Sequence, residues 1–104
     1  MDRKMVILAM YDLPRTTSVA RRRAQAIHKE FLRRGYCMLQ ESVYVKLLKN
    51  GRTVTHEMDE LHRMLPEGGN IDAISMTLNV FKSIKIWGNS PFNLAYFAED
   101  MLVL

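Results

Sequence analysis

An apolar run that stops abruptly at an aspartate constrains the fold of this chain more than any other feature. Residues 5–11 are apolar without interruption, as expected of a central strand covered on both faces. Asp12 follows directly, and Pro14 then ends the strand because it has no N–H to donate. Ligands in α/β proteins gather beyond the carboxyl ends of strands, so Asp12 is a candidate functional residue. The structural alternative is that Asp12 only caps a turn or a helix.

Two helices and further strands are expected after this point. Apolar residues recur at spacings of four, three and four in residues 20–31 and 54–65, which predicts two amphipathic helices with one shared apolar surface. Gly35 should end the first helix, because glycine accepts the left-handed backbone of a helix cap. Periodicity leaves open whether the first β-rich segment holds one strand or two. The expected strands lie in residues 36–48, 71–78 and 83–87.

This order of elements predicts an α+β fold. Strand, helix, strands, helix, strands is the pattern of a ferredoxin-like domain, in which both helices pack on one face of an antiparallel sheet. We assign this domain to residues 1–88. Residues 89–104 form a tail that is too apolar for a frayed end. We expect the tail either to pack back on its own domain or to dock on another chain by adding an edge strand.

Basic charge is concentrated in one half of the chain. Residues 1–50 carry eleven Lys/Arg against four Asp/Glu, whereas residues 51–104 carry four against seven. Arg21, Arg22 and Arg23 lie near a predicted helix start, where cations oppose the helix dipole. With Arg15 they favour contact with the phosphates of a nucleic acid. The alternative is a hydrated helix face that only keeps the protein soluble.

Several kinds of site and location are disfavoured. The chain has no Cys/His spacing typical of zinc and no Gly-rich phosphate loop. It also has no apolar run long enough to span a membrane and no signal-peptide cleavage pattern, so we expect a cytoplasmic protein. Glu57, Asp59 and Glu60 lie in the first turns of the second helix, and we expect them to form a solvated acidic face.

Asp12 alone is a poor site for a divalent cation. Magnesium takes six oxygens, usually one or two carboxylates completed by waters or substrate phosphates. A domain of 104 residues also gains from pairing with a second copy, and a twofold dimer would supply a second Asp12 by symmetry. Such a pair could hold Mg²⁺ and support metal-assisted phosphodiester hydrolysis.

Four motifs, in this order and spacing, carry a resemblance to a known family. They are Tyr11-Asp12-Leu13-Pro14, Arg21-Arg22-Arg23, Arg34-Gly35-Tyr36 and the run from Met38 to Tyr44. The chain resembles CRISPR-associated protein 2, the small subunit that works with the CRISPR integrase to capture new spacers. It is most similar to the branch associated with type II systems.

The resemblance implies a ferredoxin-like homodimer in which Asp12 is the catalytic residue and the Mg²⁺ ligand at the dimer interface. Some members of the family are reported to be nucleases. The resemblance also implies that the dimer bridges two integrase dimers and lies along double-stranded prespacer DNA, which Arg15 and Arg21–Arg23 would contact. The tail would cross to the partner subunit or to the integrase. The residues expected to make this contact are Phe92, Leu102, Val103 and Leu104.

We rank a DNA-bridging adaptor ahead of an endonuclease, because the basic residues are many and the catalytic candidate is a single aspartate. The third hypothesis is a toxin-type metal-dependent endoribonuclease of the same fold, or a general binder of single-stranded RNA. The sequence leaves open whether cleavage is physiological and whether RNA or DNA is cut.

Overall fold

The expected order of helices and strands is present, with one exception described below. The structure is a computed structural model, and it describes residues 3–97. The main elements are β1 (Met5–Asp12), α1 (Ser18–Arg33), β2 (Cys37–Gln40), β3 (Val43–Leu48), α2 (Val54–Arg63) and β4 (Asn70–Thr77). A 3₁₀ turn (Gly51–Thr53) precedes α2, and a short helix α3 (Leu78–Phe81) follows β4.

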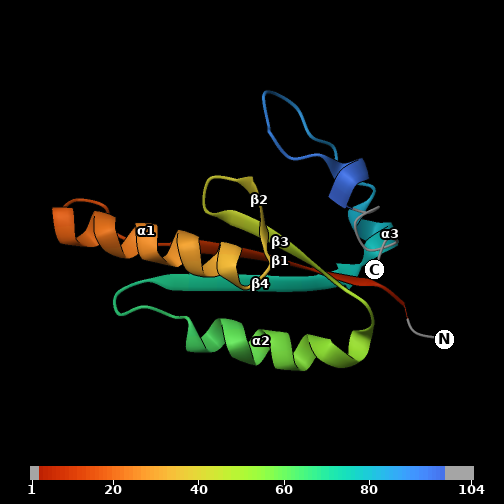
Figure 1. Ribbon diagram of the computed structural model, residues 1–104, viewed down its shortest axis with the longest axis horizontal. Helices are drawn as coiled ribbons and strands as arrows, with labels where there is room; N and C mark the ends of the chain where they lie inside the picture. The colour runs from red at the N-terminus through yellow and green to blue at the C-terminus, as the bar shows by residue number, and fades with distance from the viewer. Residues whose placement is uncertain (1–2, 98–104) are drawn as a thin grey trace.

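The four strands form one antiparallel sheet in the order β2-β3-β1-β4. The apolar strand β1 therefore lies in the interior of the sheet, as its composition predicts. Helices α1 and α2 lie alongside the sheet (Figure 1), and both contribute to one core on the same face. This arrangement confirms the predicted α+β fold and is that of a ferredoxin-like domain.

The core between the helices and the sheet is built around stacked aromatic rings. Phe31 of α1 stacks on Tyr44 of β3 with ring centroids 4.4 Å apart, and Tyr11 of β1 stacks against both rings at 5.9 Å. Ala24 and Ile27 complete the buried stripe of α1. The helical spacing in residues 20–31 thus predicted the buried face correctly.

The opposite face of the sheet is covered only in part. Side chains alternate along a strand, so Val6, Leu8 and Met10 point away from α1 and α2. α3 lies at the end of the sheet where β1 begins (Figure 1), and there Phe81 and Phe97 bury Val6 and Val45. The far half of this face stays open. We call it the open face, and it includes Met10 and Ile74, which are 41% and 55% exposed.

Residues 36–48 hold two strands rather than one. A turn at Glu41–Ser42 joins them, and Ser42 adopts φ = 65°, a left-handed conformation unusual for a residue other than glycine. The backbone N–H of Tyr11 donates to the carbonyl of Ser42 at 3.0 Å, which ties this turn to the end of β1.

The predicted strand at residues 83–87 is absent. Thr77 ends β4 and caps α3, its Oγ1 accepting from the N–H of Val80 at 3.2 Å. This helix turns the chain away from the sheet, so residues 83–87 pair with no strand among residues 3–97. Periodicity alone did not reveal this, because an extended apolar segment has the same pattern whether or not it finds a neighbour.

The described part of the tail packs on its own domain. Phe92 and Phe97 lie against Phe81, with ring centroids 6.1 and 5.5 Å away. Packing back on the domain is one of the two expected outcomes. Docking of the tail on a partner stays a prediction, and Leu102, Val103 and Leu104 lie outside the described residues.

The expectation of a solvated acidic face is wrong for Glu57. This residue is only 9% exposed, and its Oε1 accepts from Lys46 Nζ at 2.9 Å and from the Tyr36 hydroxyl at 3.3 Å. Glu60 is also paired, with Arg34 at 3.1 Å. These cations come from β3 and from the end of α1, so the local sequence of α2 could not show them.

Within residues 3–97, none of the helices combines the length and the apolar character needed to cross a bilayer.

Candidate functional site

Asp12 is the last residue of β1, and its side chain is exposed. Alternation along the strand places it on the open face, together with Leu8 and Met10. Thr17 caps α1 instead, with its Oγ1 accepting from the N–H of Ala20 at 3.0 Å. No hydrogen bond or ion pair engages the Asp12 carboxylate within the described part of the chain. The structural alternative, a cap, is therefore excluded, and the carboxylate is available to a ligand.

The backbone around Asp12 is closely packed. Gly69 follows α2 and lies against the end of β1, where a Cβ on it would come within 2.4 Å of Leu13 Cδ2 and 3.2 Å of the Asp12 carbonyl oxygen. A larger residue would require the Leu13 side chain to move and the Asp12 carbonyl to shift by a few tenths of an ångström. The lack of a Cβ at Gly69 thus lets the loop after α2 approach the end of β1 closely.

Asp72 is a second carboxylate on the open face that the sequence analysis did not consider. In the β1–β4 register Asp12 lies opposite Asn70, and Met10 lies opposite Asp72. Asp72 is therefore a diagonal neighbour of Asp12 on the same face of the sheet. The pattern that could have revealed it is the alternation of Asp72 with Ile74 and Met76 in a strand beside β1.

One chain offers a divalent cation only part of a site. No group of three or more acidic, histidine or cysteine side chains suited to a metal occurs among residues 3–97. The donor set of one chain is the Asp12 carboxylate, with Asp72 nearby. Magnesium commonly takes one or two carboxylates and fills its remaining positions with waters and phosphates. If a second subunit contributed its own Asp12 across the open face, the site would have the two carboxylates that magnesium commonly takes.

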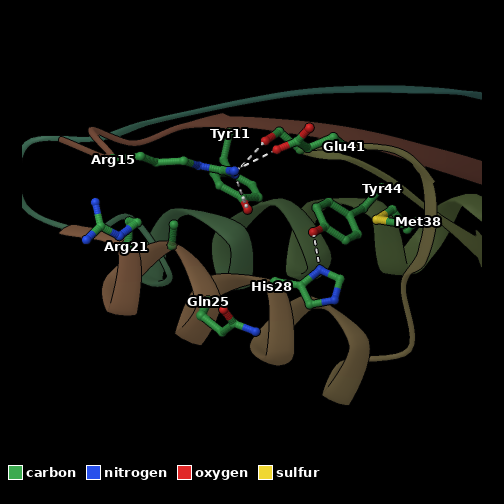
Figure 2. Close-up of a pocket in the computed structure, with 10 residues that line it drawn as sticks. Tyr11, Arg15, Arg21, Gln25, His28, Met38, Glu41 and Tyr44 are labelled. Carbon is green, nitrogen blue, oxygen red and sulfur yellow. Dashed lines mark hydrogen bonds and ion pairs between the residues drawn. The ribbon is translucent and has the colours of Figure 1, made fainter. Parts of the chain in front are cut away.

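Arg15 is held on the other face of the sheet. Its Nη1 donates to Glu41 Oε1 at 2.6 Å, and its Nη2 donates to the Tyr11 hydroxyl at 3.2 Å and to Ser42 Oγ at 3.3 Å (Figure 2). The hydrogen bond to Glu41 raises the pKa of Arg15 above its already high value. Because Tyr11 belongs to the core under the helices, Arg15 and Asp12 lie on opposite faces at the end of β1.

The three consecutive arginines are exposed on the first turns of α1. Within residues 3–97 none of Arg21, Arg22 and Arg23 has a carboxylate partner. At the other end of α1, in contrast, Arg33 and Arg34 pair with Glu30 at 2.5 and 2.8 Å. The start of α1 therefore presents positive charge without compensation, which is the property a polyanion requires.

These arginines do not form a single flat patch. Successive residues of a helix point about 100° apart. Arg21 lines a cavity with His28 and Tyr44, whereas Arg23 lines a groove with Pro66 and Glu67. The structure thus brings Arg15 and Arg21 together at one cavity, whereas Arg22 and Arg23 lie outside it on α1.

Comparisons with known proteins agree on one family. A family model described as CRISPR associated protein Cas2 matches residues 5–84, from the start of β1 to beyond α3. A protein of Acidovorax ebreus named CRISPR-associated endoribonuclease Cas2 is 35% identical over 88 residues, covering 84% of this chain and 85% of that protein. A Campylobacter jejuni protein of the same name is 28% identical over 104 residues, covering 99% and 73% of the two chains.

The fold agrees with a solved structure of the same family. The crystal structure of Streptococcus pyogenes Cas2 at pH 6.5 superposes with a TM-score of 0.60 and 19% sequence identity, covering 80% of this chain and 99% of that one. At this identity the likeness concerns the fold alone.

Proposed function

This chain belongs to the Cas2 family of CRISPR-associated proteins, and we propose that it is a homodimeric adaptor that bridges two integrase dimers and binds prespacer DNA during spacer integration. The observation that carries this proposal is the open face, an apolar surface that ends in an available carboxylate, Asp12. The same dimer would carry magnesium-dependent endonuclease activity.

A second copy of the chain is the partner that best suits the open face. Met10 and Ile74 are neighbours on it, on adjacent strands, and an exposed apolar surface of this kind commonly marks an interface. A twofold axis through the open face would pair identical surfaces. It would also bring the two Asp12 side chains toward each other.

The basic start of α1 supports the DNA-binding part of the proposal. Arg22 and Arg23 are exposed and have no carboxylate partner within residues 3–97. In a dimer this surface occurs twice, once on each subunit. Two separated clusters of cations on a rigid dimer suit a long, regular polyanion such as duplex DNA better than a small anion.

Asp12 supports the endonuclease part. If Mg²⁺ binds between the two subunits, it can activate a water and stabilise the charge that develops on a phosphate. Asp12 would hold the cation, at the end of a strand that the loop of Gly69 approaches closely. The arginines lie on the other face, so they would guide the nucleic acid rather than contact the reacting phosphate.

The dimer can be tested by placing a charge on the open face. Ile74→Glu should convert the dimer to a monomer in light scattering and weaken duplex binding, because a carboxylate would be buried without a partner. Leu32→Glu is the matched control, since Leu32 is exposed to a similar degree but lies on α1. If Ile74→Glu remains dimeric, the open face is not the interface.

A toxin-type metal-dependent endoribonuclease is the second candidate. Two observations favour it: the relatives carry the name endoribonuclease, and Asp12 is exposed without a partner in the described residues. Cleavage of single-stranded RNA by the purified dimer, without any binding to the integrase, would favour this function over the adaptor.

A further inference from the structure

A cavity lined by both polar and apolar side chains lies on the helix side of the sheet, away from Asp12 and the open face. It measures about 320 Å³, at the lower end of the range for ligand pockets. One wall is α1, which contributes Arg21, Gln25 and His28 at spacings of four and three, so that all three face the same way. The opposite wall is the turn between β2 and β3, and the floor is formed by Tyr11 and Tyr44.

The two ends of this cavity differ in chemistry. Figure 2 shows Arg15 and Arg21 at one end and Met38 at the other, with Gln25 and His28 along the helix between them. Arg15 is tied to Glu41, but Arg21 has no carboxylate partner among residues 3–97. One end therefore carries a net positive charge, and the other offers an apolar side chain and polar groups suited to a planar ring.

Two of the polar groups of the cavity, on His28 and Arg15, are held by hydrogen bonds within the protein. His28 Nδ1 lies 2.5 Å from the Tyr44 hydroxyl, which fixes the imidazole ring and leaves its Nε2 for another partner. Arg15 is fixed by its bonds to Tyr11 and Ser42. Gln25 has both a donor and an acceptor at the end of its side chain, the combination that pairs with the edge of a nucleobase. His28 and Arg15 are thus positioned before a ligand binds, so these two side chains lose little conformational entropy on binding.

From these observations we propose that the cavity binds one nucleotide unit. Its phosphate would lie between Arg15 and Arg21, and its base would lie against Met38 within reach of Gln25 and His28. This inference rests on the proposed function for the nature of the ligand and deepens it by adding a pocket for a single nucleotide. The unit can come from a free nucleotide or from the single-stranded end of a nucleic acid.

The test compares adjacent arginines on the same helix. Calorimetric titration with adenosine 5′-monophosphate should give saturable binding to the wild-type protein, and Arg21→Ala should weaken it at least tenfold. Arg22→Ala is the matched control, because Arg22 is equally basic but does not line the cavity, and it should leave the affinity within twofold. Equal weakening by both variants would overturn the proposal, since it would show only general attraction of an anion.

A second variant tests the part of the cavity that receives the base. Met38→Trp should fill this end and weaken binding of the mononucleotide at least tenfold, while both arginines stay in place. Inorganic phosphate should bind much more weakly than the mononucleotide. If phosphate binds equally well, or if Met38→Trp leaves the mononucleotide affinity unchanged, the base makes no contribution and the proposal fails.

Oligonucleotides identify the source of the nucleotide. Tighter binding of a duplex with 5′-phosphorylated single-stranded ends than of the mononucleotide, with the difference lost in Arg21→Ala, would assign the pocket to strand ends. Preference for the mononucleotide would assign it to a free nucleotide. If blunt duplex DNA binds but neither probe enters the cavity, this inference fails and the proposed function stands. If no nucleic acid binds at all, both fail.

Discussion

Lys46 of β3 donates a 2.9 Å hydrogen bond to Glu57 of α2, and this pair joins the second helix to the sheet. Lys46 Nζ also lies 5.6 Å from the centre of the Tyr36 ring, whose hydroxyl donates to the same carboxylate at 3.3 Å. Burial and the nearby Glu57 carboxylate raise the pKa of Tyr36, so this hydroxyl stays protonated and remains a donor.

Removing the cation of this pair should destabilise the protein. Lys46→Met keeps most of the side-chain volume but leaves Glu57 largely buried with only the tyrosine as partner. We expect the free energy of unfolding to fall by roughly 2 kcal/mol, somewhat less than for a fully buried pair. Urea denaturation measures this change. The double variant Lys46→Met with Glu57→Gln should recover part of the loss, and a double variant as unstable as the single one would contradict the explanation.

The ion pairs of Glu30 should make the stability of the protein depend on pH in the acidic range. Hydrogen bonds from Arg33 and Arg34 lower the pKa of Glu30 from 4.5 to about 2. Because the folded-state pKa is the lower one, the stabilisation is present above pH 4.5 and is lost as the pH falls toward 2. Glu30→Gln should therefore flatten the fall in stability over this range. Thermal unfolding of both proteins between pH 6 and about pH 2 tests this, and parallel curves would show that Glu30 is not responsible.

The parts of the fold that could be predicted from sequence depend on local pattern. The continuous apolar run of β1 and the spacing of Ala24, Ile27 and Phe31 on α1 required no knowledge of distant residues, and both were confirmed. Asp12 was correctly placed at a strand end for the same reason. Its exposure on the open face follows from alternation along β1, once the positions of the two helices are known.

What could not be predicted depends on residues far apart in the chain. Glu57 looked like part of a solvated helix face because its partner Lys46 lies on a separate strand. Arg15 follows Asp12 by three residues, but Glu41, 26 residues away from Arg15, holds it on the other face. The cavity beside α1 combines segments from Tyr11 to Tyr44. No pattern within one segment could have indicated it.

The proposed endonuclease activity depends on the charge of Asp12. Asp12→Asn has almost the same size but loses the carboxylate that would hold magnesium, so cleavage should fall at least 100-fold. Asp72→Asn should reduce cleavage less. Asp72 lies on the same face, but it is opposite Met10 and not at the end of β1. Both variants should remain dimeric in light scattering. Full cleavage by a purified Asp12→Asn dimer would exclude the metal-dependent mechanism and leave the adaptor role.

The exposed arginines should contribute to duplex binding, and the dependence of the affinity on salt concentration measures this contribution. Each phosphate contact that is lost lowers the slope of log affinity against log salt by about 0.9, so Arg22→Ala with Arg23→Ala should lower it by about 2 for each subunit that contacts DNA.

The matched control for this measurement is Arg33→Ala, because Arg33 is exposed on the same helix but already neutralised by Glu30. Its slope should stay close to that of the wild type. The loss in the double variant should be the same for duplexes of different sequence, since phosphates carry no sequence information. A loss confined to one sequence would mean that the arginines contact bases, and an unchanged slope would place the DNA on another surface of the dimer.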